Sequence, residues 1–409
     1  MANRIEDIRV TPIAFRDPPL LNVAGCHEPW ALRSIIEVEI EGGFVGLGES
    51  YGSKSVLDAI AALAPRMIGR DGMDLNALRR EGSAVIVEDG GERRLPRAVA
   101  AIEVACHDAF GKASGRRVCE ILGGQVRETV PFSAYLFYKF ARHHGEAEDD
   151  AWGEVLTPEA MVDEARRMVD EYGFEAIKLK AGVLEPEAEI EALRALRDAF
   201  PRAPLRIDPN GGWHVHTTLK LLPELERLLE YLEDPTIGIP SMGLIQSATS
   251  LPLATNMCVV AFDHLPQAIA SGAVRVILSD HHYWGGLRAS RELARICDIF
   301  GISLSMHSNS HLGISLAAMA HLAAATPNLT YDCDTHYPWQ VDEVIEGGKL
   351  TIRDGEMKLP DGPGLGVTLD RDALARLHRN YLDAGLTRRD DATEMRKHWP
   401  GWQDGRPRF

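Results

Sequence analysis

Ionisable or amide side chains follow a series of short apolar runs at nearly equal spacing. The series is Lys178 with Lys180, Asp208, Glu233, Asn256, Asp280, His307, and Asp334 with His336. From Lys180 to Asp334 the successive steps are 28, 25, 23, 24, 27 and 27 residues, each about the length of one βα unit. The carboxyl ends of parallel strands meet at one rim, and helix capping alone does not require such residues at every strand end. The pattern therefore predicts an active site.

Asp208, Glu233 and Asn256 offer hard oxygen ligands from three successive predicted strands. No thiolate or imidazole stands among them, which favours Mg²⁺ over zinc. Three protein ligands leave positions of an octahedral shell for water and substrate oxygens. The predicted cofactor is Mg²⁺.

Lys178 and Lys180 lie two residues apart on one predicted strand, so their side chains point to the same face. Like charge, burial and a nearby divalent cation each disfavour protonation, which makes a lysine a base near neutral pH. Across the rim, His307 ends the seventh predicted strand and Asp280 the sixth. A neighbouring carboxylate fixes the tautomer of an imidazole and supports its charged form, so this pair predicts a second acid–base group.

The elements that position these residues alternate between short strands and helices from about residue 131 to 340. The predicted strands are FSAYLFY, AIKLK, LRIDPN, YLEDP, PLATNM, VRVILSD, ISLSMHS and NLTYDCD. Helical periodicity marks segments such as 158–173 and 288–301. This repetition predicts a TIM-type barrel, since an open doubly wound sheet would need fewer strands and a glycine-rich phosphate turn after the first. GLGES at 46–50 and PGLGV at 363–367 connect no strand to a helix, and we interpret them as turns.

Before residue 131 the pattern is different. SIIEVEIEGGFVGLGES, at 34–50, alternates as a β-hairpin does, and PRAVAAIEVACHDAFGKASG, at 96–115, is typical of a helix. An α+β segment is therefore expected ahead of the barrel.

The composition is that of a globular protein of 409 residues, with 45% hydrophobic and 25% charged residues. Its 60 acidic and 44 basic residues give a formal net charge of −16, which argues against nucleic-acid and membrane partners. The start MANRIEDIRV does not resemble a signal peptide, no apolar run approaches the ~18 residues of a membrane span, and the six cysteines form no CxxC motif. We expect a cytoplasmic protein with reduced cysteines.

The order of AIKLK, IDPN, LEDP, a strand-end Asn, a strand-end Asp and a strand-end His resembles the enolase superfamily, in its mandelate racemase-like branch. More narrowly, LLNVAGCHEP, LATNM, LSDHHYWGG, MHSNSHLGISL, CDTHYPWQ and a late RRDD are similar to the glucarate dehydratase family. The resemblance runs from about residue 10 to the C-terminus. It implies an α/β fold, a modified TIM barrel (β/α)7β over 131–364, with a capping domain formed by 1–130 and completed by about 365–409.

The resemblance also implies a chemistry. Mg²⁺ held by Asp208, Glu233 and Asn256 would support dehydration of D-glucarate, and of L-idarate, to 5-dehydro-4-deoxy-D-glucarate. The steps are C5 proton abstraction, stabilisation of an ene-diolate and loss of the C4 hydroxyl, with C5 epimerisation as a further outcome. Lys180 is implied as one base, with Lys178 as its modulator and carboxylate partner, and the His307/Asp280 dyad as the other. The implied substrate contacts are Asn22, His27, Tyr135, Phe137, Asn210, Ser308, His336 and Arg389, with Arg388 as the alternative to Arg389.

Three other interpretations are open. One is a dehydratase or epimerase of the same superfamily acting on another acid sugar. Another is a zinc hydrolase, for which His214-Val215-His216 has the HxH form but lies in a predicted loop, and His307 and His311 would need a helix between them. The third is a non-catalytic binding protein, against which the intact bases and oxygen ligands argue. The expected partners are a small acid sugar and further copies of the chain in a homo-oligomer.

Overall fold

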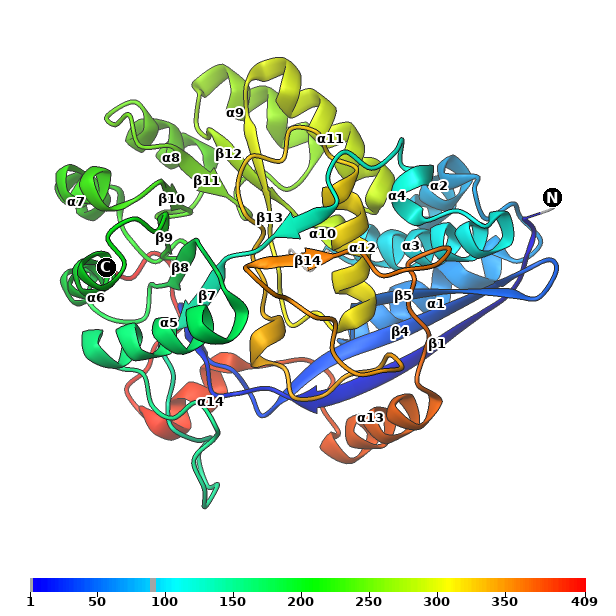
Figure 1. The fold of residues 1–409 in the computed structure, drawn as a ribbon, viewed down its shortest axis with the longest axis horizontal. Helices are drawn as coiled ribbons and strands as arrows, with labels where there is room; N and C mark the ends of the chain where they lie inside the picture. The colour runs from blue at the N-terminus through cyan, green and yellow to red at the C-terminus, as the bar shows by residue number, and fades with distance from the viewer. Residues whose placement is uncertain (1–2, 89–92) are drawn as a thin grey trace.

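The structure is a computed structural model that describes residues 3–88 and 93–409, and it places a capping domain beside a barrel of βα units (Figure 1). The capping domain contains an antiparallel sheet in the order β1-β4-β5. Its strands are β1 (Ile5–Arg16), β4 (Trp30–Ile40) and β5 (Phe44–Tyr51). Strands β4 and β5 pair from Ile40 with Phe44 to Arg33 with Tyr51, which confirms the predicted hairpin.

One helix packs on this sheet at unusually close range. The helices of this part of the chain are α1 (Lys54–Met67), α2 (Leu75–Val85), α3 (Arg94–Ser114) and the short α4 (Val118–Ile121). Helix α3 covers the predicted helix at 96–115 and packs against β5. A Cβ atom at Gly46 would lie 1.9 Å from the carbonyl oxygen of Ala105, and one at Gly48 would lie 2.2 Å from that of Ala101. The GLGES segment is therefore a strand that lets a helix approach, and not the turn expected from its glycines.

Seven parallel strands form the second sheet, and their order in space from β7 to β13 is their order in the chain. The strands are β7 (Ala134–Phe137), β8 (Ile177–Lys180), β9 (Leu205–Asp208), β10 (Tyr231–Glu233), β11 (Leu253–Thr255), β12 (Val276–Ser279) and β13 (Ser303–Met306). Helices alternate with them, namely α5 (Pro158–Tyr172), α6 (Pro186–Ala199), α7 (Val215–Leu228), α8 (Ile239–Gln246), η1 (Phe262–His264), α9 (Leu265–Ser271), α10 (His281–Trp284), α11 (Leu287–Phe300) and α12 (Gly313–Ala324). This arrangement confirms the predicted class of fold, a modified barrel with a capping domain.

The eighth predicted strand, NLTYDCD at 328–334, is not a regular strand in the structure. It closes the gap between β13 and β7 through isolated parallel bridges, which join Leu304 with Leu329 and Phe132 with Cys333. Thr330 and the residue after it both donate to the carbonyl of Leu304, at 3.1 Å each. Two consecutive amides on one carbonyl interrupt the ladder, so the segment completes the barrel without forming a continuous strand.

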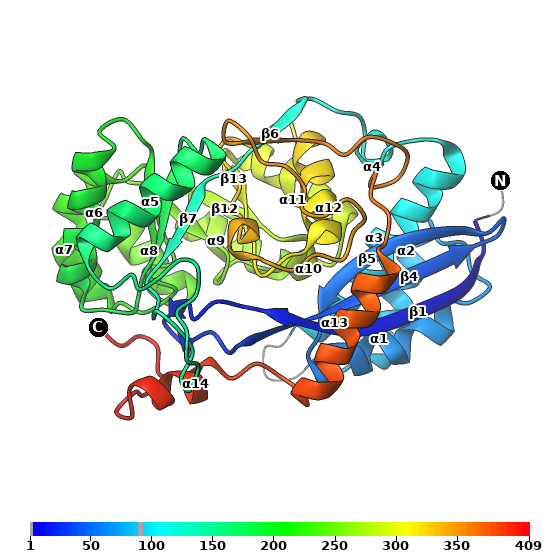
Figure 2. The ribbon, with the colours of Figure 1, turned by 60° about the horizontal axis from the view of Figure 1, so that its bottom comes forward.

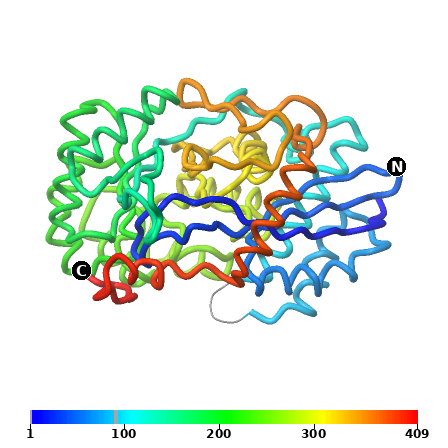
Figure 3. Tube along the Cα trace, turned by 90° about the horizontal axis from the view of Figure 1, so that it is seen from below, coloured from blue at the N-terminus to red at the C-terminus, as the bar shows by residue number. Residues whose placement is uncertain are grey.

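Segments from the end of the chain pack on elements from its beginning. Strand β14 (Glu356–Lys358) pairs with β6 (Thr129–Pro131), and η2 (Tyr337–Trp339) precedes it. Helix α13 (Arg371–Ala384) lies against β1, and α14 (Asp391–His398) lies against β3, which with β2 forms the small hairpin Leu21–Asn22 and Gly25–Cys26 (Figure 2). Figure 3 shows the blue segment that carries this hairpin running from the capping domain toward the green βα units, with the red C-terminal segment along the same side.

Two further properties concern the chain as a whole. None of the helices that the structure describes is both long and apolar enough to span a membrane. The cysteines are all unpaired within the described residues, and all but Cys258 are buried. Burial raises the pKa of the Cys106 and Cys333 thiols, which is typical of packing residues and not of reactive ones.

The close packing of β5 on α3 yields a stability prediction. Gly46→Ala is expected to lower the free energy of unfolding by about 3 kcal/mol, because its methyl group meets backbone atoms that cannot rotate away. Gly243→Ala in α8 is the control, since its Cβ would have only ordinary contacts at 3.5 Å or more, with Ser271. Urea denaturation followed by circular dichroism measures both variants. Equal stability of the two would contradict the proposed constraint.

Candidate active site

The carboxyl ends of the parallel strands surround a cavity of about 280 Å³. Pairing of β8 with β9 places Lys180 opposite Asp208, and Lys180 lines the cavity. All the substrate contacts implied by the resemblance line the same cavity, as do one proposed metal ligand and both proposed bases. The predicted residues around it are Asn22, His27, Tyr135, Phe137, Lys180, Asn210, Asn256, His307, Ser308, His336 and Arg389.

Behind the cavity lies a buried cluster of two lysines and three carboxylates. The Lys178 Nζ atom is 2.6 Å from Asp334 Oδ2, 2.6 Å from Glu233 Oε2 and 3.9 Å from Asp208 Oδ2. The Lys180 Nζ atom lies 2.5 Å from Asp208 Oδ2. Lys178 is fully buried, and its described ion pairs are all with these carboxylates.

The charges of this cluster set its protonation. Burial lowers the pKa of Lys178, but Asp334 and Glu233 raise it, and the net pKa lies well above its usual value. The sequence predicted that the paired lysine lowers the pKa of Lys178, and for this residue the prediction is wrong. Three carboxylates converge on its ammonium, which the sequence did not show. Burial raises the pKa of Glu233 well above its usual range, against the opposing effect of Lys178. At Asp208, burial is outweighed by Lys180 and Lys178, and the pKa falls below its usual value.

The donor set at this rim fits a divalent cation. Asp208 and Glu233 end β9 and β10, and Asn256 follows β11, so three neighbouring strands present oxygen atoms to one place. The Glu233 Oε1 atom is buried and has no hydrogen-bond partner in the structure. A buried carboxylate oxygen without a partner is costly, and a cation would supply the missing interaction.

Asp234 holds the loop that carries Asn256. Its carboxylate accepts hydrogen bonds from the Thr255 hydroxyl, at 2.6 Å, and from the backbone N–H of Asn256, at 2.8 Å. The backbone of Asp234 has a positive φ of 34°, a conformation that fixed partners must maintain. Asp234 therefore positions the proposed amide ligand. The sequence motif LEDP contained this residue, but its spacing alone did not separate Asp234 from Glu233.

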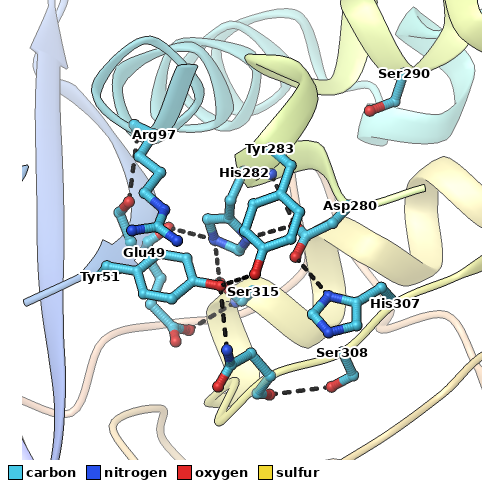
Figure 4. Close-up of polar contacts among 12 residues, drawn as sticks. Glu49, Tyr51, Arg97, Asp280, His282, Tyr283, Ser290, His307, Ser308 and Ser315 are labelled. Carbon is cyan, nitrogen blue, oxygen red and sulfur yellow. Dashed lines mark hydrogen bonds and ion pairs between the residues drawn. The ribbon is translucent and has the colours of Figure 1, made fainter. Parts of the chain in front are cut away.

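His307 lines the cavity and is hydrogen-bonded to Asp280 behind it; Figure 4 shows this pair. The His307 Nδ1 atom lies 3.0 Å from Asp280 Oδ2, and the Tyr283 ring stacks on the His307 ring with centroids 5.5 Å apart. Burial raises the pKa of Asp280, but His282 and His307 outweigh it and hold that pKa well below its usual value. Asp280 is therefore a stable anion that fixes the His307 ring and leaves Nε2 for the cavity.

The capping hairpin and the C-terminal segment complete the cavity through a charged network. The His27 Nδ1 atom is 3.0 Å from Asp17 Oδ2, and Arg389 donates to Asp17 at 3.3 Å and to Asp391 at 2.8 Å. The Asn22 amide donates to Asp391 at 3.1 Å. This geometry distinguishes the two adjacent arginines of RRDD, because Arg389 lines the cavity and the neighbouring Arg388 is exposed.

Aromatic rings form one wall of the cavity. Tyr135 and Phe137 have ring centroids 4.6 Å apart, and His336 lies 4.9 Å from the first and 5.0 Å from the second. The cluster of lysines and carboxylates borders this wall, because Lys178 Nζ lies 4.6 Å from the centroid of the Tyr135 ring.

Several lining residues were not among the predicted contacts. Tyr283, Asn309 and Asp391 lie within the sequence motifs named above. The motifs alone did not show which of their residues face the cavity. Arg406 lies after the RRDD motif, in the last residues of the chain, where the sequence offered no motif. A larger cavity of about 700 Å³, against Leu95, Phe262 and Trp284, shares Tyr283 with the first cavity, but the lysine–carboxylate cluster does not line it.

The zinc alternatives find no support in this geometry. His214 precedes α7 and His216 lies within its first turn, so His216 is helical where a loop was expected, and both are exposed away from the cavity. Residues 307–312 are not helical. Asp280, His282 and His311 have possible ligand atoms within 4.8 Å of one another, but the carboxylate already accepts from two imidazoles and Arg33 lies beside the His282 ring.

Two family models match the sequence. "Mandelate racemase / muconate lactonizing enzyme, N-terminal domain" covers residues 9–123, and "Enolase C-terminal domain-like" covers residues 160–373. The chain therefore belongs to the enolase superfamily, whose solved members include structures crystallised with magnesium. The fold and the family thus define an enzyme of this superfamily, and the magnesium in those structures supports a divalent-metal site.

Particular relatives narrow the comparison. A probable glucarate dehydratase from Streptomyces coelicolor is 48% identical over 97% of both chains, and a D-xylonate dehydratase from Haloferax volcanii is 28% identical over 85% of this chain and 84% of that one. A structure called an enolase, from Mycobacterium smegmatis and complexed with tartrate, has a TM-score of 0.96 and 54% identity, covering 99% of this chain and 98% of that one. The chain is a glucarate dehydratase-like enzyme of the hydro-lyase type.

The ligand set yields a binding prediction. Glu233→Gln is expected to weaken Mg²⁺ binding by more than about 100-fold, since even contacts outside the ligand shell contribute about 10- to 100-fold. Glu191→Gln, on the exposed surface of α6, makes the same chemical change and should bind as the unaltered protein does. Isothermal titration with Mg²⁺ measures both. Tight binding by the folded Glu233 variant would remove Glu233 from the ligand set.

Proposed function

We propose that this enzyme dehydrates D-glucarate and its C5 epimer L-idarate to 5-dehydro-4-deoxy-D-glucarate, with Mg²⁺ as cofactor. The observation that carries the proposal is the placement of two basic side chains, Lys180 from β8 and His307 after β13, around one cavity beside three oxygen ligands. The 48% identity with a probable glucarate dehydratase supports the choice of substrate. In the overall reaction the C5 proton and the C4 hydroxide leave as water, and the enol product becomes the ketone.

Asp208, Glu233 and Asn256 would hold Mg²⁺ at the carboxyl ends of their strands. When bound, the cation supplies positive charge to the substrate carboxylate oxygens that gain negative charge as the C5 proton leaves. Lys178 keeps the surrounding carboxylates close together, since its ammonium lies 2.6 Å from both Asp334 and Glu233. It acts through those carboxylates and not as a base.

Each base would serve one epimer. His307 accepts the C5 proton of D-glucarate at Nε2, because Nδ1 is hydrogen-bonded to Asp280 at 3.0 Å, and Asp280 stabilises the imidazolium that forms. The Nζ atom of Lys180 takes the C5 proton of L-idarate from the other side. Return of the proton by the opposite base would interconvert the epimers.

The remaining cavity residues would bind and orient the acid sugar. Arg389 and Arg406 supply positive charge around a dianionic substrate in a protein whose net charge is −16. The hairpin and C-terminal segment cover the barrel mouth, where they exclude water during proton transfer. The proposed substrate contacts are Asn22, His27, Tyr135, Phe137, Asn210, Ser308, His336 and Arg389.

The setting of this activity is also a proposal. We propose that the enzyme works in the cytoplasm, as a homo-oligomer, and without nucleic-acid or membrane partners. The net charge of −16 supports the absence of nucleic-acid and membrane partners, because an acidic surface repels polyphosphates and anionic lipids. We further propose that residues 1–130 with about 365–409 form the cap and that 131–364 form the barrel. Packing of α13 on β1 supports this division.

The two-base arrangement is the direct test of the function. His307→Asn is expected to lower D-glucarate dehydration about 100-fold or more while leaving C5 proton exchange of L-idarate. Lys180→Arg should do the reverse, because arginine keeps the positive charge beside Asp208 but does not deprotonate near neutral pH. Deuterium incorporation followed by NMR measures each epimer with each variant.

The outcomes separate the alternatives. If both variants exchange both epimers at the unaltered rate, the two-base model fails. If the unaltered enzyme leaves both aldarates unchanged with Mg²⁺ present but dehydrates or epimerises another acid sugar, the substrate assignment moves to that compound.

The capping hairpin gives a further prediction. His27→Ala is expected to lower kcat/KM for D-glucarate by about 100-fold, because loss of its hydrogen bond to Asp17 frees the hairpin that closes the site. His216→Ala on the exposed start of α7 should leave kcat/KM unchanged. Steady-state kinetics together with thermal melting separate a kinetic effect from unfolding. Unaltered kinetics in the His27 variant would show that the hairpin is not part of the site.

A further inference from the structure

Two histidines share the carboxylate that orients the proposed base. Asp280 Oδ2 lies 3.0 Å from His307 Nδ1, and Asp280 Oδ1 lies 2.8 Å from both Nδ1 and the backbone nitrogen of His282. His282 is fully buried and does not line the cavity, whereas His307 does. The second imidazole therefore reaches the reacting centre only through Asp280.

The other ring nitrogen of His282 faces the capping domain and α12. Its Nε2 atom lies 3.0 Å from the carbonyl oxygen of Glu49 and 3.2 Å from Ser315 Oγ (Figure 4). It also lies 3.3 Å from Arg33 Nη2. Arg33 in turn donates to Glu49 Oε1 at 2.8 Å and to Ser315 Oγ at 3.0 Å. The ring is held at both nitrogens, so its orientation toward Asp280 is fixed.

We propose that His282 is a positioning residue for this reaction, which donates from Nδ1 to Asp280 and thereby limits how strongly Asp280 supports a charged His307. The proposal rests on the role of His307 in the proposed function. A carboxylate that already accepts two hydrogen bonds on one oxygen stabilises a neighbouring imidazolium less than one that accepts none there. His282 would keep His307 neutral, and so competent as a base, to lower pH.

The low pKa of Asp280, caused chiefly by the two imidazoles against the effect of burial, agrees with an anion shared between them. Other charged or titratable groups also surround the three residues. They are Arg33 and Glu49 on the capping sheet, Tyr51 on β5, Arg93 and Arg97 at α3, His281 and Tyr283 on α10, His311 before α12, and Lys180 and His336 at the cavity. None of these groups has a described side-chain hydrogen bond to the Asp280 carboxylate, whereas His282 does. His282 is therefore the residue to vary.

The experiment follows the pH titration of the His307 imidazole by ¹⁵N NMR, in Mg²⁺-loaded enzyme labelled at histidine and assigned from the signal lost in His307→Asn. His282→Leu removes the Nδ1 donor, so the Asp280 carboxylate stabilises the charged form of His307 more strongly. The titration midpoint of His307 should therefore rise by about half to one pH unit. His282→Asn keeps an N–H near the Nδ1 position and should restore most of the original midpoint. His378→Leu is the control, because it also loses a ring hydrogen bond, to the Pro12 carbonyl, but does not contact Asp280.

Kinetics give a second readout. Because His307 must be neutral to take a proton, the acid limb of kcat/KM for D-glucarate should move to higher pH by the same amount in His282→Leu. The pH profile of L-idarate exchange, which depends on Lys180, should stay in place. A merely structural role would lower both reactions together without moving either limb.

An unchanged His307 midpoint in folded His282→Leu would overturn the proposal. If that variant does not fold, the unaltered enzyme provides the test, since a His282 signal that shows Nδ1 without a proton would also overturn it. The NMR titration needs no substrate, so it remains decisive if D-glucarate is not turned over. Failure of turnover in the unaltered enzyme would refute the proposed function and leave the titration result standing.

Discussion

The ion pairs of the buried Lys178 are the interaction on which the barrel mouth depends. Its ammonium lies between the ends of β9 and β10 and the irregular segment that closes the barrel, through Asp208, Glu233 and Asp334. A buried carboxylate without a partner is strongly unfavourable, and removing one member of such a cluster leaves an uncompensated charge. With Lys180, two lysines meet three carboxylates, two of which, Asp208 and Glu233, are the proposed metal ligands.

The capping domain is joined to the barrel by carboxylates that bind helix ends. Glu103 on α3 accepts from the amides of Leu287 and Arg288 at the start of α11, and Glu49 on β5 accepts from Leu312 and Ser315 at the start of α12. Amide groups at helix N-termini have no partner within the helix, so a buried acid from another domain satisfies them and the helix dipole together. These contacts fix the cap over the rim.

The same interface reaches the proposed chemistry. Glu49 also pairs with Arg33, and through His282 this pair contacts Asp280 and then His307. On the opposite side of the cavity, Asn22 and Asp391 meet although 369 residues separate them in the chain. Both sides of the site therefore combine barrel residues with residues from the cap, and neither domain alone builds the cavity.

The sequence by itself determined the rim. Residues such as Lys180, Asp208 and His307 follow strands at βα-unit spacing, and parallel strands necessarily bring their carboxyl ends together. The motifs also identified the family, the residues of the capping hairpin and the pair of adjacent arginines. The turn predicted from the glycines at 46–50 is wrong, because local turn signals do not show that a helix lies against the strand.

Only the tertiary structure decided which charges meet. Four features depend on residues from different parts of the chain. They are the ion pair of Lys178 with Asp334, the choice of Arg389 over Arg388, the contact of His282 with Asp280 and the irregular closure at 328–334. Periodicity reports which face of an element a residue occupies, but it carries no information about the partner on another element. Charge and hydrogen-bond partners act over a few ångströms in space, and the fold alone sets those distances.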